Sequence, residues 1–211
     1  MKKAEVIEIK KIEPKTVEIT IVGDTDLILN KMNDVTTRQL TDARKDKAKD
    51  ITKPNKWEEI ITAIHWLNGK PVEFSEKSLE ENLNPKVNAP CITAFGLKKS
   101  FGEALTRNKI STYSTEFRAT VNVLGGRDNL IPISFTEYHL DEKLMSPKKG
   151  APVLVKQNRF SGWSATFKIS FLDNVYSLEQ IVNIINLAGF GLGIGSGRNS
   201  DYGRYHIVNI K

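Results

Sequence analysis

Glycines and arginines crowd together near the C-terminus in a pattern that suits contact with an anion. Six glycines fall within residues 189–203, and Arg198 and Arg204 lie among them. Glycine adopts positive φ without strain and lets another backbone or a phosphate come close. A guanidinium group donates a fork of hydrogen bonds that fits phosphate oxygens. The stretch is therefore either a turn between a last helix and a last strand or a cradle for a nucleic-acid backbone, with the candidate residues Gly193, Gly195, Gly197, Arg198 and Arg204.

The spacing of these glycines argues against the two common nucleotide-binding motifs. No window of residues 189–203 has the form G-x-G-x-x-G, and the chain has no G-x-x-x-x-G-K-[ST]. Those motifs place backbone N–H groups around the phosphates of a bound nucleotide. The sequence thus disfavours a mononucleotide or dinucleotide site, and it predicts no cofactor.

Further basic residues are candidates for contact with the same ligand. Arg159 stands in residues 158–162, which the sequence predicts to form a tight reversal between two strands. There it can reach a phosphate while Phe160 or Trp163 stacks a base; alternatively, the two aromatic residues are core and Arg159 is a hairpin tip. The remaining candidates are Lys148 and Lys149 in a polar loop, Arg44 in the basic stretch 38–56, and Lys168 on a strand.

The three histidines are the groups that titrate near neutral pH. We expect His65 on the flank of a helix, as a packing or surface residue, and His206 in the last strand, as a core or edge residue. His139, expected in a loop before a lysine-rich segment, is the candidate general base if the protein cleaves RNA. No H-x-x-x-H or H-E-x-x-H spacing predicts a metal site, and Cys91, the single cysteine, excludes an intramolecular disulfide.

The charge balance favours an anionic partner without naming it. The chain of 211 residues holds 31 Lys and Arg against 25 Asp and Glu, a net charge of +6, and a modest excess of this kind also keeps a protein soluble. No apolar run approaches the ~20 residues that cross a bilayer. The lysine-rich start also lacks the apolar centre of a secretion signal. We therefore expect a cytoplasmic protein with no membrane partner.

Hydrophobic periodicity predicts the elements that position these residues. Alternation predicts strands at 16–22, 116–124, 131–135, 163–171 and 202–210. Helical spacing predicts a helix at 57–67, one capped by Thr93 that runs to Leu105, and one capped by Ser177 with Gln180 that ends at a C′ glycine, Gly189. The order strand, helix, strand, strand, helix, strand matches the ferredoxin-like plan, an α+β fold with both helices on one face of an antiparallel sheet.

We expect one elaborated domain, 1–211, in which residues 30–90 form a basic, partly helical insertion after the first strand. Acidic residues recur every four positions in 38–56, which suits an exposed helix as well as a ligand-binding arm. Residues 71–90 are expected to be a connection with one short strand. The free sheet face is predicted to be polar and without aromatic residues, which does not support base stacking as RNA-recognition domains use it. Its expected residues are Glu18, Thr20, Arg118, Thr120, Asn122, Ser164, Thr166 and Lys168.

Several stretches carry a resemblance to known proteins. A ferredoxin-like half that ends in helix, glycine-rich loop and strand, with GLGIGSGR at 191–198 and YGR at 202–204, resembles the repeat-associated (RAMP) superfamily of CRISPR-system RNA-binding proteins. Four sequence segments are also similar to uncharacterised proteins of bacteriophages and prophages: TDLILNKM, WSATFKISF, SLEQIVNIINLAGFGLGIGSGR and YGRYHI. The likeness covers residues 163–210 well, the first thirty residues loosely, and the middle of the chain not at all.

The resemblance implies that the glycine-rich loop approaches an RNA backbone and that copies stack side by side along a strand, as a homo-oligomer in the cytoplasm of a bacterial host cell. It leaves three functions open. The first, which we favour because no histidine maps onto the usual catalytic stretch of the family, is a non-enzymatic binder of single-stranded RNA or DNA. The second is a metal-independent endoribonuclease of the guide-processing type, with His139 as its base. The third is a phage structural or anti-defence protein that binds a protein partner.

Overall fold

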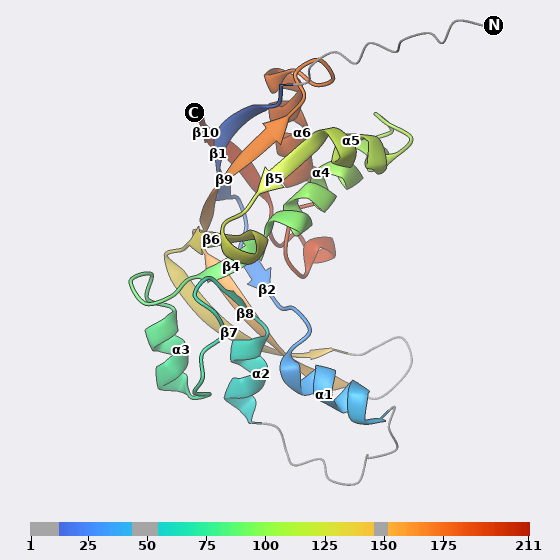
Figure 1. The fold of residues 1–211 in the computed structure, drawn as a ribbon. Helices are drawn as coiled ribbons and strands as arrows, with labels where there is room; N and C mark the ends of the chain where they lie inside the picture. The colour runs from blue at the N-terminus through green and yellow to red at the C-terminus, as the bar shows by residue number, and fades with distance from the viewer. Residues whose placement is uncertain (1–12, 44–54, 146–151) are drawn as a thin grey trace, which may run out of the picture.

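The computed structural model describes residues 13–43, 55–145 and 152–211, and these form two antiparallel sheets with helices packed against them (Figure 1). The mixed α+β class with an antiparallel sheet is confirmed. The candidate residues Arg44, Lys148 and Lys149 lie outside the described residues.

The larger sheet has seven strands within the described ranges, and every ladder in it is antiparallel. Six strands follow one another in the order β10 (Tyr205–Ile210), β1 (Lys15–Gly23), β9 (Ser164–Phe171), β6 (Leu130–Ser134), β4 (Pro90–Thr93) and β3 (His65–Trp66). The seventh, β5 (Val121–Leu124), pairs with the end of β9 that β6 does not reach. β1 and β9 are thus central, and they confirm the strands that the alternation at 16–22 and 163–171 predicts.

The smaller sheet has three strands in the order β2 (Leu27–Leu29), β8 (Val153–Ser161) and β7 (Glu137–Met145). All three residues of β2 are buried. Since only three residues separate β1 from β2, the chain passes directly from the larger sheet to the smaller one.

The helices divide into two groups (Figure 1). α4 (Ala94–Arg107), α5 (Ser114–Thr120) and α6 (Leu178–Gly191) lie together beside the strands β1, β9 and β10. α1 (Asp34–Ala43), α2 (Lys56–Thr62) and α3 (Glu76–Asn82) lie at the other end, near β7 and β8. Two short 3₁₀ turns, η1 (Arg127–Asn129) and η2 (Arg198–Ser200), complete the described elements.

The main core lies between the larger sheet and the group α4–α6. The alternate residues Ala165, Phe167, Ile169 and Phe171 of β9 are at most 3% exposed. They meet the buried stripes of α4 and α6, and Phe101 packs against Phe167 with ring centroids 6.4 Å apart. Burial of each phenylalanine or isoleucine side chain contributes about 1.5–3 kcal/mol, so this layer fixes α4 and α6 on the sheet.

Both predicted caps are present. The Thr93 Oγ1 atom accepts a hydrogen bond from the Gly96 N–H at 3.0 Å, and α4 starts immediately after Thr93. Ser177 and Gln180 form a reciprocal capping box at the start of α6. Each cap satisfies backbone donors that a helix start leaves without intrahelical partners.

The helix predicted at 57–67 is too long. α2 ends at Thr62, and the chain turns into β3, where His65 lies opposite Cys91. The apolar pattern continues past the helix because Trp66 is buried in the strand, and its Nε1–H group donates to the Ile61 carbonyl at 2.9 Å. In residues 71–90, a capped helix, α3, takes the place of the expected connection with a strand.

The strand predicted at 116–124 begins as a helix. Ser114–Thr120 forms α5, and only the second half of the predicted strand is β5. α5 packs against α4, where a Cβ atom on Gly102 would come within 3.1 Å of Ser114 Cβ. This packing overrides the alternation, so Arg118 and Thr120 lie on a helix and not on the free sheet face.

Three further positions differ from expectation. His139 lies within β7 and not in a loop. Arg159 lies within β8 and not at a hairpin tip, because the reversal occurs at Gly162, whose φ is +58°. Helix α6 continues through Gly189 to Gly191. Gly189 instead admits the neighbouring strand, because a Cβ atom there would come within 2.0 Å of the Tyr205 carbonyl oxygen.

Candidate functional site

Backbone hydrogen bonds fix the loop from residue 192 to residue 204, which lies between α6 and β10. The Ile194 N–H donates to the Gly203 carbonyl at 2.9 Å, and the Ser196 N–H donates to the Ile28 carbonyl of β2 at 2.8 Å. Gly195 has φ +76°, and a Cβ atom there would lie 2.5 Å from the Ile28 oxygen. The glycines therefore let the loop lie against β2. This contact fixes the position from which the following residues, including Arg198, extend.

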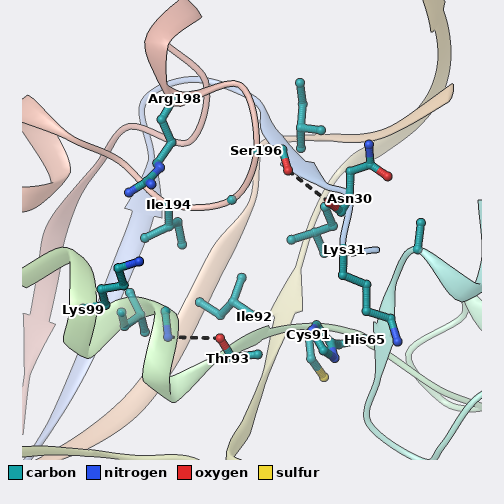
Figure 2. Close-up of a pocket in the computed structure, with 16 residues that line it drawn as sticks. Asn30, Lys31, His65, Cys91, Ile92, Thr93, Lys99, Ile194, Ser196 and Arg198 are labelled. Carbon is teal, nitrogen blue, oxygen red and sulfur yellow. Dashed lines mark hydrogen bonds between the residues drawn. The ribbon is translucent and has the colours of Figure 1, made fainter. Parts of the chain in front are cut away.

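Beside the loop lies a cavity of about 250 Å³, shown in Figure 2. Its walls come from the loop, from the chain that leaves β2, from the β3–β4 pair and from the start of α4. The lining residues are Ile28, Leu29, Asn30, Lys31, Ala63, His65, Cys91, Ile92, Thr93, Gly96, Leu97, Lys99, Ile194, Gly195, Ser196 and Arg198.

Three cationic side chains from three different segments line this cavity: Lys31 after β2, Lys99 on α4 and Arg198 on the loop. The Glu103 carboxylate of α4 lies 3.7 Å from Lys99 Nζ and 3.8 Å from Arg198 Nη1. It therefore holds both cations on the same wall. Lys99 and Arg198 remain 53% and 38% exposed, so both can still meet a ligand.

His65 and Cys91 lie on the opposite wall from the loop (Figure 2). Burial lowers the pKa of His65 below its ordinary value of 6.5, and the nearby Lys31 charge lowers it further. The imidazole is thus neutral at pH 7. Burial raises the pKa of the Cys91 thiol to about 12, and its Sγ–H donates to the Ala89 carbonyl, so Cys91 is not an activated nucleophile.

A second cavity of about 340 Å³ adjoins the first. The two share Lys31, His65 and Thr93, and the second is also lined by Ile64, Trp66, Lys70, Asp128 and Leu130. Together they form what we call the basic groove, which runs from Arg198 and Lys99 past Lys31 and His65 to Lys70. A groove of two joined cavities suits an extended ligand better than a compact one.

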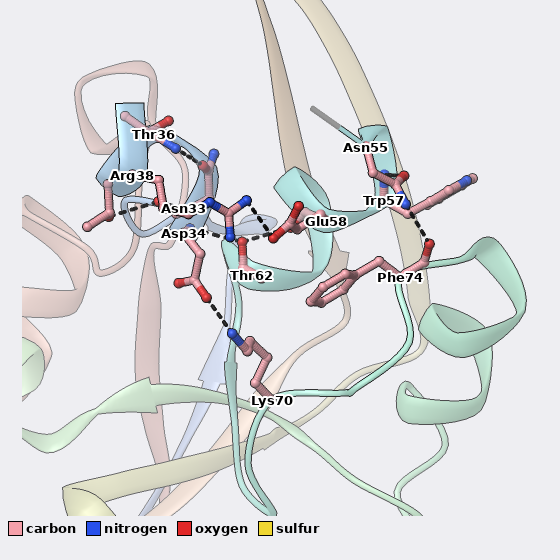
Figure 3. Close-up of polar contacts among 11 residues, drawn as sticks. Asn33, Asp34, Thr36, Arg38, Asn55, Trp57, Glu58, Thr62, Lys70 and Phe74 are labelled. Atoms are coloured by element: carbon pink, nitrogen blue, oxygen red, sulfur yellow. Dashed lines mark hydrogen bonds and ion pairs between the residues drawn. The ribbon is translucent and has the colours of Figure 1, made fainter. Parts of the chain in front are cut away.

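A set of polar contacts holds the far end of the groove (Figure 3). Lys70 forms an ion pair with Asp34 at the start of α1, which lowers the pKa of the Asp34 carboxyl mainly through this hydrogen bond. Arg38 of α1 pairs with Glu58 of α2 at 2.8 Å. The Asp34 N–H donates to Thr62 Oγ1 at 3.1 Å, so α1 is fastened to α2 just beyond Lys31.

The start of α4 also faces the groove, since Thr93, Gly96 and Leu97 line it. The N-terminal end of a 14-residue helix carries a partial positive charge from its aligned peptide dipoles. This charge adds to that of the three cations. The groove thus presents cationic groups and a helix start to one ligand, an arrangement suited to phosphate.

The predicted site residues are only partly brought together. Gly195 and Arg198 line the groove, and Gly193 and Gly197 shape the same loop, each with positive φ. Arg204 instead forms an ion pair with Asp201 of the same loop at 2.9 Å and is 18% exposed, so it stabilises the loop and does not line the groove. Lys168 lies on the outer face of β9, opposite Glu18 of β1.

Arg159 and His139 lie opposite one another on neighbouring strands of the smaller sheet. Arg159 lies 3.2 Å from Asp26 and 3.1 Å from Asp141, so two carboxylates engage its guanidinium group. His139 lies 3.2 Å from Glu137 on its own strand. Neither residue lines the groove. Phe160 and Trp163 are fully buried, which leaves neither ring a free face for stacking.

Sequence reasoning missed Lys31, His65, Lys70, Lys99 and Ser196 as groove residues. Lys99 carried a signal, because it falls outside the apolar stripe of a predicted helix. Lys31 carried a weaker one, since it follows the buried β2 segment directly. The sequence spacing of His65 and Lys70 does not indicate that they lie near the glycine-rich loop. They come close to it only because β3 pairs with β4 in the folded sheet.

Within the described residues, no group of three or more His, Cys, Asp and Glu side chains is arranged to hold a metal ion. In the same ranges, no helix has the length and apolar character that a bilayer crossing requires.

Comparisons with known proteins give structural likeness only. No protein-family model and no curated protein matches the chain. Among solved structures, the chain is similar to one in the type III-B Cmr-beta complex bound to cognate target RNA, with a TM-score of 0.46 and 13% identity. That match covers 93% of this chain, which spans 59% of the length of the other. It is also similar to Cmr6 from Pyrococcus furiosus, with a TM-score of 0.33 and 12% identity over 94% of this chain and 100% of the other.

Proposed function

We propose that this chain is a non-enzymatic protein that binds single-stranded RNA or DNA and holds the backbone of the strand in the basic groove. The observation that carries the proposal is the convergence of Lys31, Lys99 and Arg198, from three separate segments, on one concave surface. Clustered cations in a groove form an electrostatic footprint for phosphates. Because such contacts follow the backbone, we expect little sequence preference.

We further propose that residues 1–211 form one elaborated ferredoxin-like domain of the RAMP type, of phage origin, with residues 30–90 as an insertion. The chain order β1, α4, β5, β9, α6, β10 and the sheet order β10-β1-β9-β5 support this assignment, since both belong to the ferredoxin-like plan. The sequence likeness of the C-terminal stretch supports the same assignment.

The other candidates have supporting roles in this proposal. Arg159 and Arg204 hold the smaller sheet and the loop in place through their ion pairs. We keep Lys168, Arg44, Lys148 and Lys149 as further proposed phosphate contacts; Lys168 does not line the groove, and the other three lie outside the described residues. We also propose that copies assemble along a strand, which predicts cooperative binding whose strength rises with strand length. A strict one-to-one complex on long strands would contradict assembly but would not contradict binding in the groove.

The groove is tested by fluorescence anisotropy of labelled single-stranded RNA, single-stranded DNA and duplex across a salt series. In a variant with Lys31→Ala, Lys99→Ala and Arg198→Ala, we expect weaker binding to all single strands. The slope of log affinity against log salt will fall by about 2, because each phosphate contact contributes ~0.7 for single strands.

The matched control removes the same charge elsewhere, with Lys77→Ala, Lys86→Ala and Arg107→Ala, none of which lines the groove. Its salt slope will remain within about 0.5 of that of the parent protein. Equal losses in both triple variants would show that net charge, and not the groove, governs binding. That result would overturn the proposal.

A second candidate function follows from the position of His65, which is neutral at pH 7 and lies in the groove beside Lys31. In metal-independent RNA cleavage, a neutral imidazole takes the proton of a 2′-hydroxyl, and the 2′-oxygen attacks phosphorus. The 5′-oxygen leaves and takes a proton from an ammonium group, which yields a 2′,3′-cyclic phosphate. His65 meets this requirement better than His139, which lies outside the groove. Cleavage of RNA without added metal, lost in His65→Ala, would establish it; intact RNA on a denaturing gel would exclude it.

A further inference from the structure

Phe95 is an exposed aromatic ring on α4, next in sequence to Gly96, which lines the groove, although Phe95 itself lines neither cavity. It is the second residue of α4 and is 66% exposed, whereas Leu97, Phe101, Ala104 and Leu105 of the same helix are buried. An exposed aromatic residue by itself is ordinary. What distinguishes Phe95 is its place in the sequence, since Thr93, Gly96 and Lys99 around it line the groove.

The spacing puts Phe95 next to a phosphate-binding candidate. Lys99 lies four residues later, and side chains at i and i+4 share one helix face with Cβ atoms about 5–6 Å apart. Lys99 also lines the cavity with Arg198. A ring and a cation at this separation match the base and the phosphate of one nucleotide.

We propose that Phe95 stacks on an unpaired base of the strand whose phosphates lie against Lys99 and Arg198. This inference rests on the proposed function and names its substrate class, a strand with exposed base faces. In a duplex, both faces of each base are covered by neighbouring bases, so the ring gains no partner there. A phenyl ring donates and accepts no conventional hydrogen bond, so it favours unpaired strands without reading their sequence.

Phe95 also supplies what the sheet lacks. The open face of the larger sheet presents Thr20 and Thr166, joined by a 2.9 Å hydrogen bond, and the charged residues Glu18 and Lys168, which are opposite one another in the register. Phe160 and Trp163 are buried. Trp66, the aromatic residue among those that line the two cavities, is only 4% exposed, whereas Phe95, on the first turn of α4, is 66% exposed.

The experiment compares two strands of about 12 nucleotides, a length within known single-strand site sizes. One carries ordinary thymine bases, and the other has tetrahydrofuran abasic units with the same phosphates. In Phe95→Leu, we expect binding of the base-bearing strand to weaken roughly tenfold and binding of the abasic strand to stay unchanged. Phe190→Leu is the matched control, because Phe190 is 83% exposed on α6, which contributes no residue to the groove.

The outcomes separate the two proposals. If Phe95→Leu binds the base-bearing strand as tightly as the parent protein does, or loses equal affinity for both strands, base stacking on Phe95 is overturned and the groove stands. If the parent protein binds neither strand at low salt, the groove proposal fails and the stacking proposal fails with it. Unchanged melting temperatures of both leucine variants will show that the fold is intact.

Discussion

Arg198 Nη1 lies 3.8 Å from Glu103 Oε2, so an arginine of the loop after α6 is steadied by a carboxylate of α4. The same carboxylate faces Lys99 at 3.7 Å, and no hydrogen bond from the described residues reaches its buried Oε2 atom. Glu103 thus aligns two cations and also weakens the field that they present to a phosphate.

Replacement of Glu103 by Gln should separate these two effects. The ion pair is partly exposed and worth about 0–1 kcal/mol of alignment. Removal of one negative charge several ångströms from a bound phosphate gains more than that at an effective dielectric of about 20. We expect binding of a single strand to tighten severalfold at low salt and the gain to shrink as salt screens the groove. Anisotropy across a salt series measures this, and weaker binding at every salt concentration would assign Glu103 to alignment alone.

Gly195→Ala should damage both the loop and the groove. The residue has φ +76°, and the new Cβ would lie 2.5 Å from the Ile28 carbonyl oxygen, a backbone atom that cannot move aside cheaply. We expect a loss of about 2 kcal/mol in unfolding free energy, measured by denaturant titration, and weaker strand binding because Arg198 shifts.

Gly191→Ala is the control for that variant. A Cβ atom there meets nothing within 4 Å, and Gly191 ends helix α6 without a positive φ. It should be neutral or stabilising by up to about 1 kcal/mol. Equal losses in both variants would contradict the account of the loop.

His65 should make stability and binding depend on pH in opposite directions. Its folded pKa lies below 6.5, so between these two values the unfolded chain binds the proton more readily. The stabilising contribution is therefore complete above pH 6.5 and is lost as the pH falls toward the folded pKa. Strand binding instead tightens over the same fall, because protonation adds a cation to the groove.

His65→Gln removes the titrating group from both measurements. Chemical denaturation and anisotropy at pH 7.5 and 5.5 should show smaller pH effects than in the parent protein. If the pH dependence of binding is unchanged in this variant, His65 does not face the bound strand.

Lys70→Gln tests whether the second cavity belongs to the binding surface. Loss of this cation should lower the salt slope of single-strand binding by about 0.7, the value of one phosphate contact. The change also releases Asp34 from its exposed ion pair, at a stability cost below about 1 kcal/mol. Lys77→Gln, on α3 and away from the groove, is the control; an identical slope in all three proteins would confine the strand to the first cavity.

The sequence predicted the central strands and the capped helices because local signals and burial agree there. The alternation of β9 predicts both its period and its buried face, and Ser177 with Gln180 marks the start of α6. The pattern failed at α5, where packing on α4 outweighs an alternation of Phe117, Ala119 and Val121 that also fits a strand. Periodicity reports which residues are buried but not which neighbour buries them.

Of the residues that line the groove, the sequence predicted only those of the glycine-rich loop, which are close together in the chain. Arg198 and Gly195 belong to one dense motif, and the loop itself presents them to the groove. Lys31, His65 and Lys70 reach it through the pairing of β3 with β4 and the passage of the chain through β2. Such long-range pairings leave no spacing signal. Arg159 was predicted as a phosphate contact, but Asp26 and Asp141 engage its guanidinium group. The strand pairings that bring these two carboxylates beside it are not visible in the sequence pattern.

The loop contact between Ser196 and Ile28 has a mechanical consequence. β2 belongs to the smaller sheet, while α4 and α6 rest on the larger one, so the groove lies where the two sheets meet. If a strand binds as proposed, it contacts Lys31 beside the smaller sheet and Lys99 and Arg198 beside the larger one, so that the bound strand links the two sheets. Such a bound strand should restrain rotation of one sheet against the other, and a saturating concentration of strand should raise the melting temperature of the protein in a single transition.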